Sequence, residues 1–135
     1  MSLFVDTSVW SLAFRRDSPP DVPEVGRLRD ALEGGETVCT TGLVLQELMQ
    51  GWRGPRDEES LIDLFTVIAM IVPTRSDHID AARLRNACRR RGIQVGTIDA
   101  LLAQMCIRYG LLMLTTDRDF GHIAGYTSLR LWRVV

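Results

Sequence analysis

Short apolar runs alternate along the chain with segments whose apolar residues recur at helical spacing. The short runs predict strands over residues 3–5, 37–40, 67–72, 111–114 and 129–134. Helical spacing covers residues 7–14, 25–32, 43–52, 61–68, 77–91 and 98–109. Strands that alternate with helices imply crossover connections and a parallel sheet covered on both faces. The pattern therefore predicts an α/β domain.

Three of these helices have ends or faces that can be specified further. We expect Thr7 or Ser8 to cap the helix over 7–14. The helix over 77–91 should turn Leu84, Ala87 and Cys88 inward. Glycines at 92 and 110 end the last two helices. The apolar face predicted for residues 98–109 consists of Ile98, Leu101, Leu102, Met105 and Tyr109.

Length and composition fit one globular domain over residues 1–135. No segment approaches the roughly 20 apolar residues of a membrane span, and no signal peptide is evident, so we expect a cytoplasmic protein. Cys39, Cys88 and Cys106 lie in apolar contexts without the close spacing of a zinc site. They are expected to be buried free thiols.

Charge adds one constraint. The formal net charge is −1, so the overall charge does not indicate a polyanionic partner. All 16 basic residues are arginine, which excludes chemistry that depends on a lysine.

Four acidic residues stand apart from the surface charges. Asp6 directly follows the first predicted strand, and Asp117 closely follows the strand over 111–114. Ligands of open α/β sheets bind at the carboxyl ends of strands. Glu47 lies in the middle of an apolar helix, and Asp99 lies in the first turn of another. Carboxylates that met there would repel one another, and a divalent cation such as Mg²⁺ would resolve that conflict.

Each acid also has an ordinary structural explanation. Asp6 could cap the helix that follows it, and Asp99 could be favoured by a helix dipole. Asp117 and Asp119 fit turn chemistry, and Glu47 could pair with an arginine. The metal-site hypothesis therefore depends on the joint placement of these acids.

Four motifs, in order, resemble those of the PIN-domain ribonucleases, specifically the VapC toxins of bacterial toxin–antitoxin modules. The motifs are Val5-Asp6-Thr7-Ser8, Leu45-Gln46-Glu47-Leu48 with Gly51, Thr97-Ile98-Asp99-Ala100-Leu101-Leu102-Ala103, and Leu114-Thr115-Thr116-Asp117-Arg118-Asp119-Phe120. Together they span almost the whole chain. The resemblance implies a three-layer α/β/α PIN-like domain with a central, mostly parallel sheet of about five strands.

The resemblance also implies a site and an activity. Asp6, Glu47, Asp99 and Asp117 would form the catalytic acidic site, with Asp6 and Asp99 as the most direct ligands of Mg²⁺ or Mn²⁺. The activity would be endonucleolytic hydrolysis of RNA, with transfer RNA the expected substrate. The expected partners are a VapB-type antitoxin and a second copy in a homodimer. Supporting side chains would be Thr7, Ser8 and Thr116, with Asp119 as a further acid.

The arginines of the helix over 77–91 can be interpreted in two ways. Arg83, Arg85, Arg89 and Arg90 could contact RNA phosphates, which would make affinity fall with salt. They could equally be a solvated face with cations at the helix C-terminus.

Two other functions compete with a nuclease. Asp6 occupies the nucleophile position of phosphoaspartyl enzymes and receivers, but those proteins use a lysine that this chain lacks. A non-catalytic RNA- or partner-binding module is the other alternative. A nuclease assay with and without Mn²⁺ separates it from an enzyme.

Overall fold

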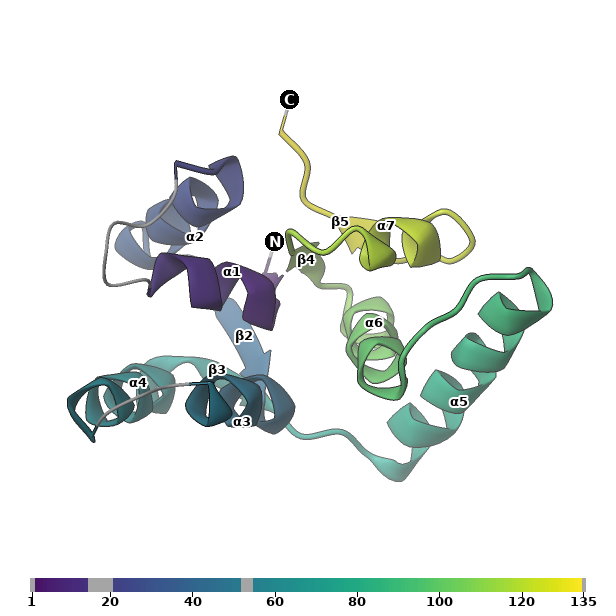
Figure 1. The fold of residues 1–135 in the computed structure, drawn as a ribbon, viewed down its shortest axis with the longest axis horizontal. Coiled ribbons are helices and arrows are strands. Elements are labelled where there is room, and N and C mark those ends of the chain that lie inside the picture. The colour runs from purple at the N-terminus through teal and green to yellow at the C-terminus, as the bar shows by residue number, and fades with distance from the viewer. Residues whose placement is uncertain (1, 15–20, 52–54, 135) are drawn as a thin grey trace.

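The structure, a computed structural model, describes residues 2–14, 21–51 and 55–134, which form five strands and seven helices (Figure 1). In chain order these are β1 (Leu3–Val5), α1 (Thr7–Ala13), α2 (Pro23–Glu33), β2 (Val38–Thr41), α3 (Gly42–Gln50), α4 (Pro55–Val67), β3 (Ala69–Ile71), α5 (Arg75–Arg90), α6 (Thr97–Tyr109), β4 (Leu112–Leu114), α7 (Asp119–Ala124) and β5 (Arg130–Leu131). The predicted α/β class is confirmed.

All five strands form one parallel sheet in the order β3-β2-β1-β4-β5. From β1 the chain adds strands in one direction, to β2 and β3, and then returns to add β4 and β5 on the other side. Because crossover connections are right-handed, this reversal places α1–α4 and α5–α7 on opposite faces. Figure 1 shows these two groups of helices on either side of the strands. The strand order reverses between β1 and β4, where open sheets of this kind bind ligands.

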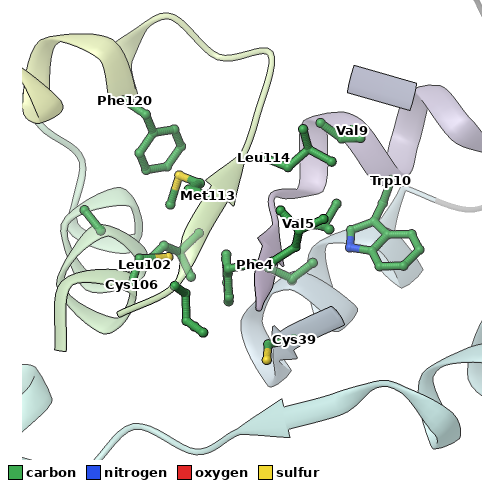
Figure 2. Close-up of a cluster of buried hydrophobic side chains, with 14 of the residues drawn as sticks. Phe4, Val5, Val9, Trp10, Cys39, Leu102, Cys106, Met113, Leu114 and Phe120 are labelled. Atoms are coloured by element: carbon green, nitrogen blue, oxygen red, sulfur yellow. The ribbon is translucent and has the colours of Figure 1, made fainter. Parts of the chain in front are cut away.

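Strand β1 is the centre of the core. Leu3, Phe4 and Val5 are completely buried, and Val5 lies opposite Leu114 in the parallel register. Figure 2 shows Phe4 and Val5 among side chains of α1, α6 and α7 around the strand. Trp10 of α1 is also fully buried and meets Phe65 edge-on, with ring centroids 5.0 Å apart. A strand held on both edges and both faces fixes the position of the residue that follows it, Asp6.

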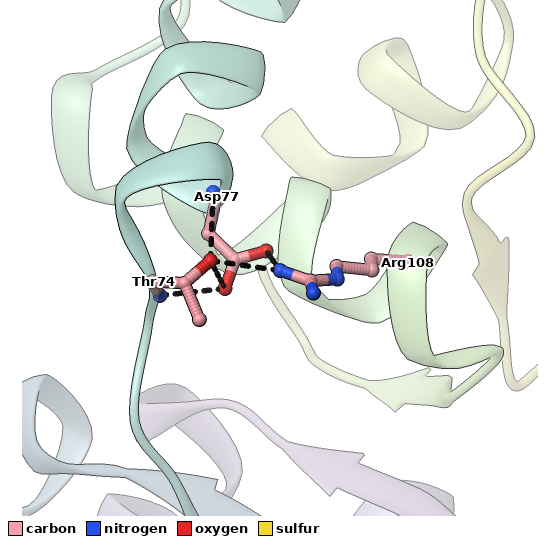
Figure 3. A network of polar contacts seen from close by, with 3 residues as sticks. All are labelled: Thr74, Asp77 and Arg108. Atoms are coloured by element: carbon pink, nitrogen blue, oxygen red, sulfur yellow. Dashed lines mark hydrogen bonds and ion pairs between the residues drawn. The ribbon is translucent and has the colours of Figure 1, made fainter.

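A buried carboxylate ties the two long helices α5 and α6 together (Figure 3). Asp77 is fully buried, accepts a hydrogen bond from the Thr74 backbone N–H at 2.8 Å, and pairs with Arg108 Nη1 at 2.7 Å. Burial opposes ionisation, but the hydrogen bonds from Thr74 and Arg108 outweigh it and lower the pKa of Asp77. The C-terminal end of α6 is thereby attached to the start of α5.

Most predicted elements are confirmed with shifted ends, and a few details were wrong. Ala87 is exposed, because the buried side of α5 runs through Ala81, Leu84 and Cys88. Ile98 and Tyr109 are 40% and 42% exposed at the ends of α6.

Three boundaries also differ from the prediction. The strand predicted over 129–134 is shorter in the structure: β5, at the edge of the sheet, covers only Arg130–Leu131. Asp6, rather than Thr7 or Ser8, occupies the N-cap position of α1. Helix α7 was not predicted. The helix predicted over 43–52 was expected to end at Trp52, which lies outside the described residues.

The three cysteines are buried free thiols, as predicted. In the part of the chain that the structure describes, no helix is both long enough and apolar enough to cross a membrane.

Candidate metal centre

Asp6 is a buried carboxylate that takes its hydrogen bonds from neighbouring hydroxyl groups. It stands at the N-cap of α1, yet its side chain makes no capping hydrogen bond. Its Oδ2 instead accepts hydrogen bonds from Ser8 Oγ and Thr115 Oγ1, both at 2.9 Å. The capping explanation for this residue therefore fails. Two hydroxyl groups on one oxygen hold the carboxylate in a single orientation.

The loop after β4 is locked to the start of α1 by the same two hydroxyl groups. Ser8 Oγ accepts a hydrogen bond from the Thr116 backbone N–H at 3.1 Å, and Thr115 Oγ1 accepts one from the Asp117 backbone N–H at 3.0 Å. Each hydroxyl group thus donates to Asp6 and accepts from the loop that carries Asp117. This arrangement fixes two acids from distant segments relative to each other.

Thr115 is the residue that sequence reasoning missed. We expected a supporting hydroxyl group from Thr116, but Thr116 is exposed and enters the network through its backbone N–H. The signal lay in the sheet register: Val5 lies opposite Leu114, so the next residues along the two strands, Asp6 and Thr115, also face each other.

Three further carboxylates gather beside this network. Asp99, at the N-terminal turn of α6, lies near Asp117 and Asp119, and one oxygen from each falls within 4.8 Å of the others. The Asp119 backbone N–H donates to Asp117 Oδ1 at 2.9 Å, which holds that carboxylate in place. Asp119, expected only as a further acid, therefore belongs to the same cluster as Asp99 and Asp117.

The electrostatics show that the other acids act on Asp99. Burial raises the pKa of Asp99 to about 6, together with the negative charges of Asp6, Asp117, Asp119 and Glu47. These four carboxylates therefore lie close enough to Asp99 to influence its ionisation. A carboxyl group with such a raised pKa in a cluster of acids is typical of functional sites.

Glu47 is partly buried on α3 and faces the same cluster. Burial and the charge of Asp6 raise the pKa of Glu47, and the nearby Thr7 hydroxyl group opposes that rise. Thr7 Oγ1 is nevertheless buried without a hydrogen bond of good geometry. Glu47 makes no ion pair within the described residues, so the arginine partner considered from the sequence is absent there.

These observations fit a divalent cation. The donor set consists of hard carboxylate oxygens, which Mg²⁺ and Mn²⁺ prefer. Within the described residues none of the five acids has a cationic partner, although their charges crowd together. The unpartnered Thr7 hydroxyl group lies beside Glu47, where it could bond to a water in the shell of an ion.

The predicted arginines lie along α5 and differ in their contacts. Arg83 pairs with Asp80 at 3.4 Å, and Arg89 donates to Asn86. Arg85 is half-buried, and its Nε donates to the Val95 carbonyl at 2.7 Å. Arg90 is exposed. Arg85 and Arg89 border a hollow of about 510 Å³ that ends at Gly96, the residue before α6.

Comparison with known families identifies the class. The model of the PIN domain matches residues 3–126, and the chain belongs to this family. Among individual relatives, it is 29% identical over 130 residues to a VapC ribonuclease of Mycobacterium bovis. Ribonuclease VapC11 of Mycobacterium tuberculosis is equally similar. The alignments cover 95% of this chain and 96% of each relative, so the resemblance to VapC ribonucleases is confirmed.

Solved structures share the fold. VapBC2 from Rickettsia felis, bound to a DNA fragment from its promoter, superposes with a TM-score of 0.77 at 21% identity and covers 98% of both chains. VapC20 of Mycobacterium tuberculosis, a toxin that cleaves the sarcin-ricin loop, superposes with a TM-score of 0.65 at 21% identity. That match covers 95% of this chain and 98% of VapC20.

Proposed function

We propose that this protein is a VapC-type toxin, a Mg²⁺- or Mn²⁺-dependent endoribonuclease of a type II toxin–antitoxin module. The observation that carries the proposal is the meeting of carboxylates from four separate segments at the point where the strand order reverses. Membership of the PIN-domain family supports the activity. The catalytic unit would be one domain over residues 1–135.

Asp6, Glu47, Asp99 and Asp117 would hold the cation, with Asp119 as a fifth acid. A bound divalent cation supplies charge neutralisation and a lowered pKa for the water that attacks phosphorus. Ser8 and Thr115 keep the Asp6 carboxylate in its orientation. The buried strand β1 and the helix start at Asp99 limit the movement of these ligands, as catalysis requires.

We propose the substrate and partners from the family resemblance and from the relatives. Transfer RNA would be the substrate; a sarcin-ricin loop, as named for VapC20, is the alternative. Arg83, Arg85, Arg89 and Arg90 would contact RNA phosphates. Since several structural neighbours are complexes of VapC with VapB, we propose a VapB-type antitoxin, and a homodimer acting in the cytoplasm.

Two substitutions test the proposal. Asp6→Asn and Asp99→Asn should each reduce Mn²⁺-dependent cleavage of total transfer RNA at least a hundredfold, since each removes a charged ligand without changing its size. Asp30→Asn, at an exposed aspartate of α2, is the matched control and should cleave normally. Circular dichroism should show that all three variants are folded. Undiminished cleavage in EDTA would refute the metal-dependent mechanism.

A further inference from the structure

A hollow of about 400 Å³ adjoins the acidic cluster on the side of β5. The loop residues Thr115, Thr116 and Asp117 form one wall, so the hollow shares a residue with the candidate metal centre. Trp132 and Arg133 form part of another wall, and Arg118 and Glu24 also border it. Its size falls within the roughly 300–1,000 Å³ of typical small-ligand pockets.

The position of Trp132 is fixed relative to the acids. Its backbone N–H donates to the Met113 carbonyl of β4 at 2.9 Å, which extends the pairing of β4 with β5. Strand β4 is followed, after Thr115 and Thr116, by Asp117. Trp132 is only half-buried, although it packs against the core. An aromatic side chain is therefore anchored at one side while part of it remains open to a ligand.

Two of the charged groups around the hollow are cations that can bind a polyanion beside the metal centre. Arg118 and Arg133 are exposed, and neither forms an ion pair within the described residues. Guanidinium groups bind phosphate oxygens in bidentate fashion. Glu24 and Asp117 contribute two opposing charges, and a cation bound at the acidic cluster would offset that of Asp117. A half-buried indole next to two guanidinium groups without ion pairs is a combination by which proteins bind single-stranded nucleic acids, with bases on aromatic rings and phosphates on cations.

We propose that this hollow binds the nucleotide next to the cleaved phosphodiester, with its base stacked on Trp132 and its phosphates held by Arg118 and Arg133. The inference rests on the proposed ribonuclease function and adds a subsite for single-stranded RNA. It also implies that the cleavage site lies in an unpaired segment, because a base within a duplex is stacked between its neighbours and has no free face for a side chain.

The first experiment measures RNA affinity without cleavage. In the Asp99→Asn background with Mg²⁺, fluorescence anisotropy gives the dissociation constant for a short labelled single-stranded RNA. Adding Trp132→Ala should weaken binding about ten- to a hundredfold, the usual effect of losing one stacked base. Trp132→Phe should keep most of the affinity because it keeps an aromatic face.

Tyr126→Ala is the matched control. Tyr126 is an exposed aromatic residue whose ring lies under the Arg91 guanidinium, outside the hollow. Its loss should leave RNA affinity unchanged. Equal affinity of the Trp132→Ala and parent chains would overturn the proposal, as would an equal loss in Trp132→Phe, which would indicate a packing role. A hollow occupied instead by a partner protein would leave RNA affinity unchanged.

A second measurement does not depend on the Trp132 variant being folded. Arg118→Gln and Arg133→Gln change exposed side chains, and each should reduce the slope of log affinity against log salt by about 0.7. An unchanged salt dependence in both variants would show that neither arginine contacts a phosphate and would overturn that part of the proposal. Failure of the ribonuclease proposal would look different: the native chain would show no metal-dependent cleavage of RNA, while the affinity measurements would still report on the hollow.

Discussion

The hydroxyl group of Thr115 offers the sharpest test of how the candidate site is held together. Thr115→Val keeps the size and branching of the side chain but removes the hydrogen bond to Asp6 Oδ2 and the acceptor for the Asp117 backbone N–H. Ser8 remains as the second donor to Asp6. The variant should therefore loosen both carboxylates without displacing the strands that carry them.

The size of the effect follows from these two bonds. A hydrogen bond to a charged group contributes about 1.5–3 kcal/mol, and every 1.4 kcal/mol corresponds to a factor of ten. Removal of residues that orient metal ligands lowers metal affinity or activity roughly 10–100-fold. We expect kcat/KM for RNA to fall by about that factor and the Mn²⁺ concentration for half-maximal activity to rise.

The assay is initial-rate RNA cleavage across a Mn²⁺ titration, with thermal melting of each variant as the check on folding. Thr115→Ser keeps the hydroxyl group and should retain most of the activity. Thr66→Val is the matched control, since Thr66 is exposed on α4 and its hydroxyl group donates to the Asp63 carbonyl, outside the acidic cluster. Full activity in Thr115→Val, or an equal loss in Thr66→Val, would refute the reasoning.

Two further predictions concern stability. The lowered pKa of Asp77 means that its ionised form stabilises the fold above the unfolded value of about 3.9, and that this contribution is lost as pH falls through the lower folded value. The free energy of unfolding of Asp77→Asn should therefore be about 2–3 kcal/mol lower at neutral pH. In urea melts over a pH series, the stability of this variant should fall less steeply toward acid pH than that of the native chain. Parallel pH curves for the two proteins would contradict the ion pair with Arg108. Because the pKa of Asp99 is raised, its ionisation destabilises the cation-free fold as pH increases. Without cation, Asp99→Asn should melt at or above the native temperature at pH 7.5, and added Mg²⁺ should raise the melting temperature of the native chain alone; an equal Mg²⁺ response in both would rule out Asp99 as a ligand.

Much of the fold was accessible from the sequence because its central strands β1, β2 and β4 are short and largely buried. Apolar runs such as Leu3–Val5 have no other explanation than a covered strand, and Gly110, with φ of +62°, ends α6 where predicted. The helix over Asp119–Ala124 was missed because its six residues form fewer than two turns, too short for a helical repeat to show. Exposure at helix ends, as for Ile98, depends on neighbours that periodicity does not describe.

The members of the candidate site were predicted from their joint placement and from the family motifs, but the hydrogen bonds that connect them were not. Asp6 and Asp117 could be placed at strand ends from the pattern alone. That Asp6 faces Thr115 instead of Thr116 depends on the alignment of β1 with β4, which the sequence of either strand does not specify. Similarly, the hollow beside Trp132 arises from α2, the loop after β4 and the chain end together.

The order in which the acids occur along the chain has a consequence for protein synthesis. Asp6 is synthesised about a hundred residues before the hydroxyl group of Thr115 and the carboxylates of Asp117 and Asp119. Strand β4 must also insert beside β1, a contact between residues about a hundred positions apart, which is slow to form. A growing chain that has not reached β4 and the loop after it would therefore lack the assembled acids, and any toxicity would begin only after these segments had been translated and folded.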